Sequence, residues 1–166
     1  MKNKKIARVT GTNKGIGFEV TRELARMGFR VFLGARNVEA GHAAAAKITD
    51  GEVIFLQLDV ADPGSIRRAA EEFSSSADRL DVLVNNAGIC LDEDKAALTI
   101  TPEIFEDTFR TNTLGPWLVA QACVPLLKKS AAPRIVNVAR GCGQPDGRAD
   151  DWRPADCVRM PAGTGA

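Results

Sequence analysis

The stretch that decides the fold is a glycine-rich turn, which reads Thr10-Gly11-Thr12-Asn13-Lys14-Gly15-Ile16-Gly17. An apolar run at residues 6–10 precedes it and a helix-period segment at residues 16–27 follows it, so it joins a predicted strand to a predicted helix. Glycines let such a turn bend tightly, approach a phosphate closely and pack the helix against the sheet. The turn predicts a nucleotide pyrophosphate at the helix N-terminus, and a βα turn without a ligand is the alternative.

The rest of the chain alternates short apolar runs with helix-period segments, which is typical of βαβ units. Strands are predicted at residues 6–10, 30–33, 53–58, 82–84 and 134–138, and helices at residues 16–27, 38–48, 65–73 and about 101–128. The last helix should be interrupted at Gly115 and Pro116, and residues 74–76, three serines, should form a helix-ending loop. We therefore predict an α/β fold, a three-layer Rossmann-type parallel sheet of about five strands in the order 3-2-1-4-5, incomplete relative to a full domain of this type. Residues 1–140 should form the dinucleotide-binding domain and residues 141–166 an irregular tail.

Composition excludes several classes of function. The chain has 166 residues and a formal net charge of +1, so no basic surplus indicates nucleic acid. No stretch has the length of a membrane span, and we expect a cytoplasmic protein. The four cysteines and the single histidine lack the spacing of a zinc site or a disulfide framework, so we predict no metal; they are Cys90, Cys123, Cys142, Cys157 and His42.

Further motifs follow the glycine turn in a fixed order. They are Leu58-Asp59-Val60, Asn85-Asn86-Ala87-Gly88, Asn112 in the long helix, and the strand Arg134-Ile135-Val136-Asn137-Val138. Together with the G-x-x-x-G-x-G spacing of the turn, they give residues 5–140 a sequence that resembles the short-chain dehydrogenase/reductase family, in particular its carbonyl-reductase-like members.

The resemblance implies a set of cofactor-binding positions. In that family the equivalents of Asp59 and Val60 lie against the adenine, and the Asn-Asn-Ala-Gly segment steadies the sheet and passes close to the cofactor. Taken singly, Asp59 would be interpreted as a capping or turn residue, and Asn85 and Asn86 as turn residues. The positions implied for the cofactor are Gly11, Asn13, Lys14, Gly15, Ile16, Gly17, Arg36, Asp59, Val60, Asn86, Ala87 and Gly88.

The end of the second strand, Gly34-Ala35-Arg36, indicates which dinucleotide is bound. A protein that reads NAD usually has a carboxylate there, which accepts hydrogen bonds from the ribose 2′-hydroxyl. The Arg36 guanidinium can instead bind a 2′-phosphate, and Lys14 adds a second cation, so we predict NADP(H). The alternative is that both are solvated surface cations.

The catalytic groups that the resemblance implies are mostly missing. In the family a tyrosine exchanges a proton with the substrate oxygen, a lysine four residues later assists it, and a serine after the fifth strand polarises the carbonyl. This chain has Ala139 and Arg140 at the serine position, no tyrosine, and no lysine after Lys129. Asn112, which in the family supports the proton relay, is the one catalytic position present. Asp156 and Cys157 lack a surrounding helix pattern that would position them as substitutes.

Arg8 and the composition after Gly141 also depart from the family pattern. Arg8 lies in the first strand, where a cation covered on both faces costs several kcal/mol unless it reaches water or a carboxylate. The change to Gly, Pro, Arg and Asp after Gly141 suggests a C-terminally truncated or frameshifted product. The fifth strand should then be left as an edge, with low stability or aggregation as the expected result.

The sequence therefore predicts an NADP(H)-dependent short-chain dehydrogenase/reductase acting on a small-molecule carbonyl or alcohol, with impaired catalysis. The alternatives are a non-catalytic NADP(H)-binding fragment and a truncated or frameshifted product without function. Association into a homo-oligomer stays open.

Overall fold

The computed structural model describes residues 4–90 and 100–139. Its centre is a five-stranded parallel sheet in the order β3-β2-β1-β4-β5, as the sequence predicts. The strands are β1 (Ile6–Thr10), β2 (Arg30–Ala35), β3 (Glu52–Gln57), β4 (Val82–Asn85) and β5 (Arg134–Asn137). The predicted tail at residues 141–166 and the predicted domain boundary at residue 140 lie outside the described residues.

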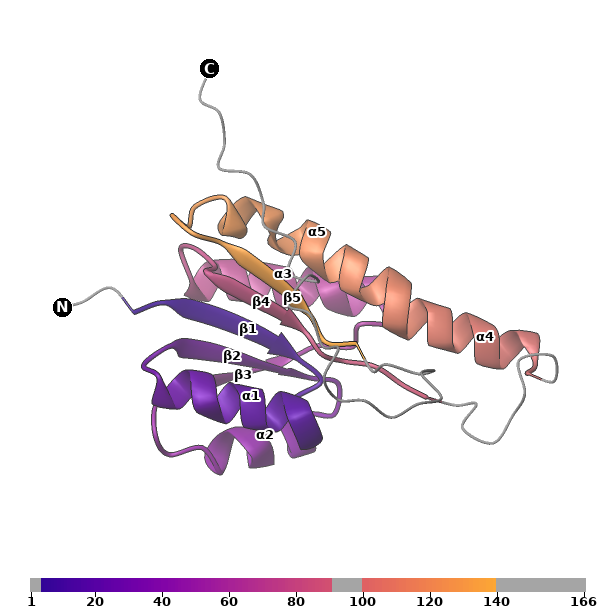
Figure 1. The fold of residues 1–166 in the computed structure, drawn as a ribbon, viewed down its shortest axis with the longest axis horizontal. Helices are drawn as coiled ribbons and strands as arrows, with labels where there is room; N and C mark the ends of the chain where they lie inside the picture. The colour runs from indigo at the N-terminus through magenta and orange to yellow at the C-terminus, as the bar shows by residue number, and fades with distance from the viewer. Residues whose placement is uncertain (1–3, 91–99, 140–166) are drawn as a thin grey trace, which may run out of the picture.

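Helices cover both faces of the sheet and give the three layers (Figure 1). On one face lie α1 (Gly15–Arg26) and α2 (Val38–Ala46), and on the other lie α3 (Pro63–Ser76) and α5 (Gly115–Leu127). The helix α4 (Pro102–Phe109) and the π-helical turn η1 (Arg110–Leu114) continue α5 toward its N-terminal side, and α4 extends beyond the sheet. Each described helix is too short or too polar to cross a lipid bilayer.

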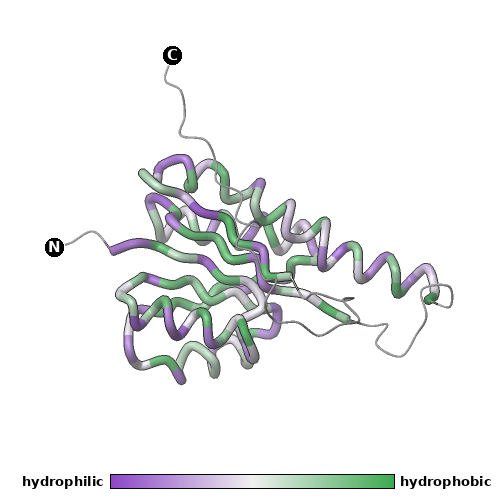
Figure 2. Tube along the Cα trace, in the orientation of Figure 1, coloured by the Kyte–Doolittle hydropathy of each residue, from purple (hydrophilic) through white to green (hydrophobic). Residues whose placement is uncertain are grey.

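The sheet is the apolar middle of the molecule, with one buried cluster on each face (Figure 2). All five residues of β1 are buried, because this strand lies at the centre of the sheet with helices on both sides. At the edge, β5 buries none of its residues fully. In the described part of the chain no strand pairs with the outer side of β5.

Local sequence signals account for most of the helix ends. Asn37, Asp62 and Thr101 precede α2, α3 and α4, and each side chain accepts a hydrogen bond from a backbone N–H of the first helical turn. The predicted glycine after α1 is confirmed, since Gly28 has φ +88° and its N–H donates to the Ala25 carbonyl. The long helix is interrupted close to the predicted position, at Arg110–Leu114, just before Gly115 and Pro116. Pro116 has no N–H, and the Gly115 N–H donates to the Arg110 carbonyl, five residues back.

The prediction of a loop at residues 74–76 is wrong, because these serines form the last turn of α3. The Ser74 and Ser75 hydroxyls donate to the Ala70 and Glu71 carbonyls one turn earlier, so both hydroxyls find their hydrogen-bond partners within the helix. The other predicted strands and helices are found, with bounds that differ by a few residues.

Arg8 is fully buried in the middle of β1. Its neighbours in the sheet are Phe32 on β2 and Leu83 on β4. The guanidinium Nη1 donates to Cys123 Sγ at 3.4 Å, and the guanidinium carbon lies 5.7 Å from the centre of the Phe73 ring. The Arg8 side chain reaches neither water nor a described carboxylate, so neither of the two compensations expected from the sequence is present.

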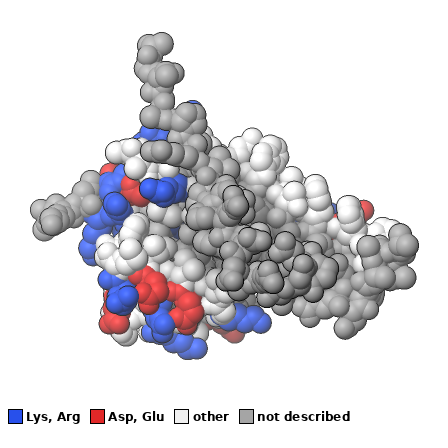
Figure 3. Space-filling model, in the orientation of Figure 1, with Lys and Arg blue, Asp and Glu red and all other residues white. Residues whose placement is uncertain are grey.

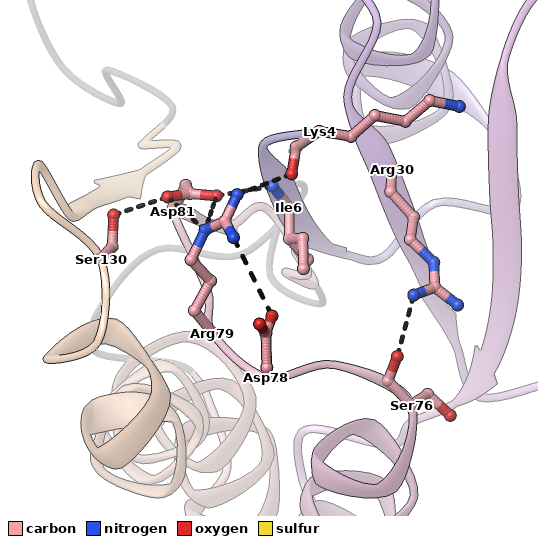
Figure 4. Close-up of polar contacts among 8 residues, drawn as sticks. All are labelled: Lys4, Ile6, Arg30, Ser76, Asp78, Arg79, Asp81 and Ser130. Atoms are coloured by element: carbon pink, nitrogen blue, oxygen red, sulfur yellow. Dashed lines mark hydrogen bonds and ion pairs between the residues drawn. The ribbon is translucent and has the colours of Figure 1, made fainter. Parts of the chain in front are cut away.

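At the amino ends of the strands, Asp81 joins three separate segments (Figure 4). Its carboxylate accepts hydrogen bonds from the Ile6 N–H at 2.7 Å, the Ser130 hydroxyl at 2.6 Å and the Arg79 guanidinium at 3.1 Å. Burial raises the pKa of Asp81, but these bonds together outweigh burial and hold the pKa below its ordinary value. Asp81 therefore connects the start of β1 with the turn that leads from α5 to β5.

Candidate functional site

The predicted site residues gather at the carboxyl ends of the strands, opposite Asp81. The glycine turn leaves β1 at this edge, next to β4, at the point where the strand order reverses, since β2 and β3 lie on one side of β1 and β4 and β5 on the other. Open α/β sheets bind ligands at this kind of position. Gly11 has φ +69°, and a Cβ at this position would lie 2.7 Å from Ala87 Cα. Only glycine therefore allows the turn to pass this close to the segment after β4.

The N-terminus of α1 differs from those of α2, α3 and α4. Its capping position is Lys14, whose side chain accepts no hydrogen bond from the helix, and no acidic residue lies in the first turn. Gly15 has φ +64° and open space around it, and Asn13, Lys14 and Ile16 are exposed as well. The first N–H groups of α1 thus point from a positive helix end toward an accessible surface.

Asn86 and Thr10 hold the turn against β4. The Asn86 amide donates to the Thr10 and Gly11 carbonyls at 2.9 and 3.0 Å. In return the Thr10 hydroxyl accepts the N–H groups of Asn86 and Ala87, both at 3.0 Å. Gly17 packs directly beneath, because a Cβ there would collide with the Asn86 amide. These contacts fix the position of the glycine turn.

Arg36 follows the last residue of β2 and is exposed, as is Lys14. Neither side chain takes part in an ion pair with the described residues. The next residue, Asn37, is occupied as the cap of α2. Two cationic side chains are therefore left available near the ends of β1 and β2.

Asp59 and Val60 follow β3 at the same edge. The Asp59 carboxylate accepts the Ala61 N–H at 2.9 Å, and its own N–H donates to the Ser65 hydroxyl at 2.9 Å. Asp59 is thus a turn residue, which agrees with the interpretation of this residue taken singly. It is also partly exposed. Val60 is buried, and Gly115 packs close to its carbonyl.

Asn112 lies in the π-helical turn and holds the segment after Gly88. Its amide donates to the Ile89 carbonyl at 2.8 Å, and its oxygen accepts the Ile89 N–H at 2.9 Å. Both ends of the side-chain amide are therefore used on one backbone unit, and this places Asn112 as a support for the segment between β4 and α4. Gly88 is exposed beside it.

At the carboxyl ends of β4 and β5, Asn85 and Asn137 are joined side chain to side chain, with Asn85 Nδ2 donating to Asn137 Oδ1 at 2.9 Å. Ala139, the position of the missing serine, is exposed beyond them. Arg140, Asp156 and Cys157 lie outside the described residues. Among the described residues no three metal-ligating side chains come together.

The roles of two residues at this edge were not predicted from the sequence. Thr10 has a hydroxyl that joins the turn to the Asn86 segment, and Ser65 has a hydroxyl that fixes Asp59. A polar residue ending a buried apolar strand is the signal that could have identified Thr10, because its hydroxyl needs a partner there.

The sequence profile of the short chain dehydrogenases matches residues 5–148, most of the chain. The chain belongs to the short-chain dehydrogenase family. One similar protein is (+)-neomenthol dehydrogenase of Arabidopsis thaliana. Its sequence is 40% identical to this one, and the match covers 87% of this chain and 56% of the length of the relative. Retinol dehydrogenase 12 of Mus musculus is 38% identical over 81% of this chain and 43% of its own length. The chain thus spans about half the length of these relatives.

Solved structures of the short-chain dehydrogenase family have the same arrangement. A metagenomic short-chain oxidoreductase in complex with NADP has a TM-score of 0.77 and 30% identity, over 84% of this chain and 64% of its own. The F189W actinorhodin polyketide ketoreductase with NADPH has a TM-score of 0.78 and 28% identity, over 86% of this chain and 57% of its own.

Proposed function

We propose that this chain binds NADP(H) at the carboxyl edge of the sheet. The observation that carries this proposal is the N-terminus of α1, which has no side-chain cap and no acidic residue in its first turn, and which has glycines of positive φ at its first residue, Gly15, and in the turn before it, Gly11. Phosphate oxygens are the partners that such N–H groups and such a helix end favour. The residues present therefore fit the pyrophosphate of a dinucleotide, held by Gly11, Gly15 and Gly17 with Asn13 and Ile16.

The remaining positions would hold the two ends of the cofactor. Lys14 and Arg36 would bind the 2′-phosphate, because both cations are exposed and make no ion pair with the described residues. Asp59 and Val60 would lie against the adenine, and Asn86, Ala87 and Gly88 beside the rest of the molecule. The solved relatives in complex with NADP or NADPH support this assignment.

The reaction we assign to the family site is reduction of a small-molecule carbonyl or oxidation of an alcohol. The bound cofactor supplies or accepts the hydride. Within this chain, the contribution of Asn112 is to hold Ile89 and so the wall of the site, through both ends of its amide. These 166 residues include no tyrosine that could donate a proton to the substrate oxygen. We therefore propose that the chain alone has little or no turnover.

A second function, cofactor binding without catalysis, is favoured by one specific observation. Ala139 stands where the carbonyl-polarising serine is expected, and a methyl group can neither donate nor accept a hydrogen bond. A chain of this kind would bind NADPH, as a regulator or as a subunit completed by another chain, and would consume none of it.

Titration with NADPH and NADH, followed by a carbonyl turnover assay, tests both functions. We expect saturable binding of NADPH with one site per chain, weaker binding of NADH, and no NADPH consumption with menthone or retinal as substrates. Absence of NADPH binding to the folded chain would overturn the proposed site. Consumption at rates typical of enzymes, at least about 1 s⁻¹, would overturn the non-catalytic assignment and leave the cofactor site standing.

A further inference from the structure

Exposed cations gather at the edge of the sheet where the strands begin, opposite the glycine turn. Lys5 precedes β1, and Arg134 is the first residue of β5. Lys128 and Lys129 follow α5, whose last turn accepts a hydrogen bond from the segment just before β4. All four residues are exposed, and none forms an ion pair with the described residues. We call these four residues the basic edge.

The contacts of Asp81 bring the segments of the basic edge together (Figure 4). The Asp81 carboxylate accepts hydrogen bonds from the residue that follows Lys5 and from the residue that follows Lys129. Its backbone carbonyl accepts the Arg134 N–H at 2.9 Å. Cations that are far apart in the sequence are therefore held on one side of the molecule.

The carboxylates beside the basic edge are engaged by other cations. Arg79 pairs with Asp81 at 3.1 Å and lies 4.0 Å from Asp78, and Glu52 pairs with Arg30 at 2.7 Å. These acidic groups therefore do not neutralise the basic edge. The whole chain has a formal net charge of only +1, so the positive charge here is offset elsewhere in the sequence.

An exposed apolar side chain lies at the same end of the sheet. Met27 follows α1 and precedes the start of β2 by three residues, and its 69% exposure is the largest among the big apolar residues of the described part. Lys5 lies beside this turn, with its Nζ 6.0 Å from the centre of the Phe29 ring. Apolar tips flanked by cations suit the interface of a bilayer, where the apolar group enters and the cations meet the headgroups. Nucleic acid would use the charges and leave Met27 in water.

We propose that the basic edge docks on the surface of a lipid bilayer that contains anionic lipids. Its four cations lie against the headgroups, and Met27 enters the interface. Each Lys or Arg near an anionic surface strengthens binding about fivefold, so four of them should favour an anionic over a neutral bilayer about several hundredfold. The glycine turn is at the opposite edge of the sheet, so it faces away from the bilayer and stays open.

The test is co-sedimentation of the full chain with vesicles of pure phosphatidylcholine and with vesicles in which about 30% of the lipid is phosphatidylserine. We expect binding to the phosphatidylserine vesicles, at least about 100-fold weaker binding to pure phosphatidylcholine, and a decline as salt is added. Saturating NADPH should change neither. Equal binding to the two kinds of vesicle would overturn the proposal. Displacement by NADPH would also overturn it, because the lipid would then lie at Lys14 and Arg36.

Variants separate the basic edge from the net charge of the chain. Lys128→Gln/Lys129→Gln should weaken binding to phosphatidylserine vesicles about 25-fold, and Met27→Gln should weaken binding to both kinds of vesicle. Arg67→Gln/Arg68→Gln on α3 removes the same charge outside the basic edge and is the matched control, which should bind like the original protein. Equal losses in the two double variants would refute the basic edge. Tighter binding to single-stranded DNA than to vesicles, weakened by the lysine changes, would assign the edge to nucleic acid instead.

Discussion

At the scale of single residues, Arg8 brings a positive charge into a strand that is buried along its whole length. We expect Arg8→Leu to raise the free energy of unfolding by about 1–4 kcal/mol, because an apolar side chain of similar length removes the desolvation of the cation. Urea denaturation of both proteins measures the change. An Arg8→Leu protein less stable than the original would show that the guanidinium is compensated in a way that its described neighbours do not provide.

In the proposed site, Arg36 is the residue that we expect to determine which dinucleotide is preferred. Arg36→Leu should weaken NADPH binding by about 10–100-fold, because a charge-assisted hydrogen bond contributes about 1.5–3 kcal/mol, and should leave NADH binding nearly unchanged. Calorimetric titration with both cofactors measures this difference. Arg67→Leu, which removes an exposed arginine of α3, is the control. A parallel loss of NADH affinity in Arg36→Leu would mean that Arg36 acts on the turn and not on the 2′-phosphate.

Features of single residues that depend on the local pattern were predictable from the sequence, and contacts between distant segments were not. Gly11 and Gly28 were predictable, because a positive φ requires glycine and the pattern around them locates the turn. The partners of Asn112 were not, because its bonds to Ile89 depend on two segments meeting in space. The surroundings of Arg8 were equally hidden, since Phe73 and Cys123 come from helices distant in sequence.

At the scale of elements, Thr10 joins β1 to the segment that follows β4. Thr10→Val keeps the shape of the side chain and removes the acceptor of two N–H groups, so it should lower the free energy of unfolding by about 1–3 kcal/mol and weaken NADPH binding. Thr10→Ser keeps the hydroxyl and is the control. Chemical denaturation and cofactor titration measure the two effects. Equal behaviour of the valine and serine variants would refute the role of this hydroxyl.

Asp81 should make stability depend on pH in acid. Its pKa is lower in the folded protein than in the unfolded chain, so its contribution to stability is fully present above the unfolded value, near 3.8, and is lost as the pH falls through the folded pKa. Asp81→Asn should therefore be less stable at neutral pH and lose less stability on acidification. Urea midpoints measured between pH 2 and pH 7 test this. Asp78→Asn, at a largely exposed neighbour, should follow the original protein throughout.

Most elements were predictable because their signals are local. Each strand is a short apolar run, and Thr101 with Pro102 marks the start of α4. The loop predicted at the serines that end α3 was wrong. Serine is common in loops, but here the hydroxyls donate hydrogen bonds to carbonyls of the helix. The strand order followed from the order usual in Rossmann-type sheets and not from any local signal.

At the scale of the whole molecule, the long helix leaves aromatic side chains uncovered. α4 has no buried residue, and Phe105, Phe109 and Trp117 are half or more exposed. Charged side chains gather over the end of the molecule that carries α1 and α2, whereas the described surface over α4 and α5 in the same view is mainly uncharged (Figure 3).

We therefore expect the chain to self-associate through this helix, which would make it a homo-oligomer. The double variant Phe105→Gln/Phe109→Gln should shift the protein toward the monomer, as measured by size-exclusion chromatography with light scattering over a range of concentrations. A double variant with two exposed polar residues of α3 changed, Glu71→Gln/Glu72→Gln, is the control. A monomer at every concentration for the original chain would contradict this expectation.

The central position of β1 also has a consequence for how the chain folds during synthesis. β1 pairs with β2 on one side, but its other neighbour is β4, far along the chain. A ribosome adds about 5–20 residues per second, so after β3 is complete at residue 57 the nascent chain waits about 1–6 s for the end of β4 at residue 85. During that time one side of β1 is open, and water can still reach Arg8. The arrival of β4 and α5 is the step that removes this water, and we expect it to be the slow step of folding, since long-range parallel pairing is slow and here it also buries a cation.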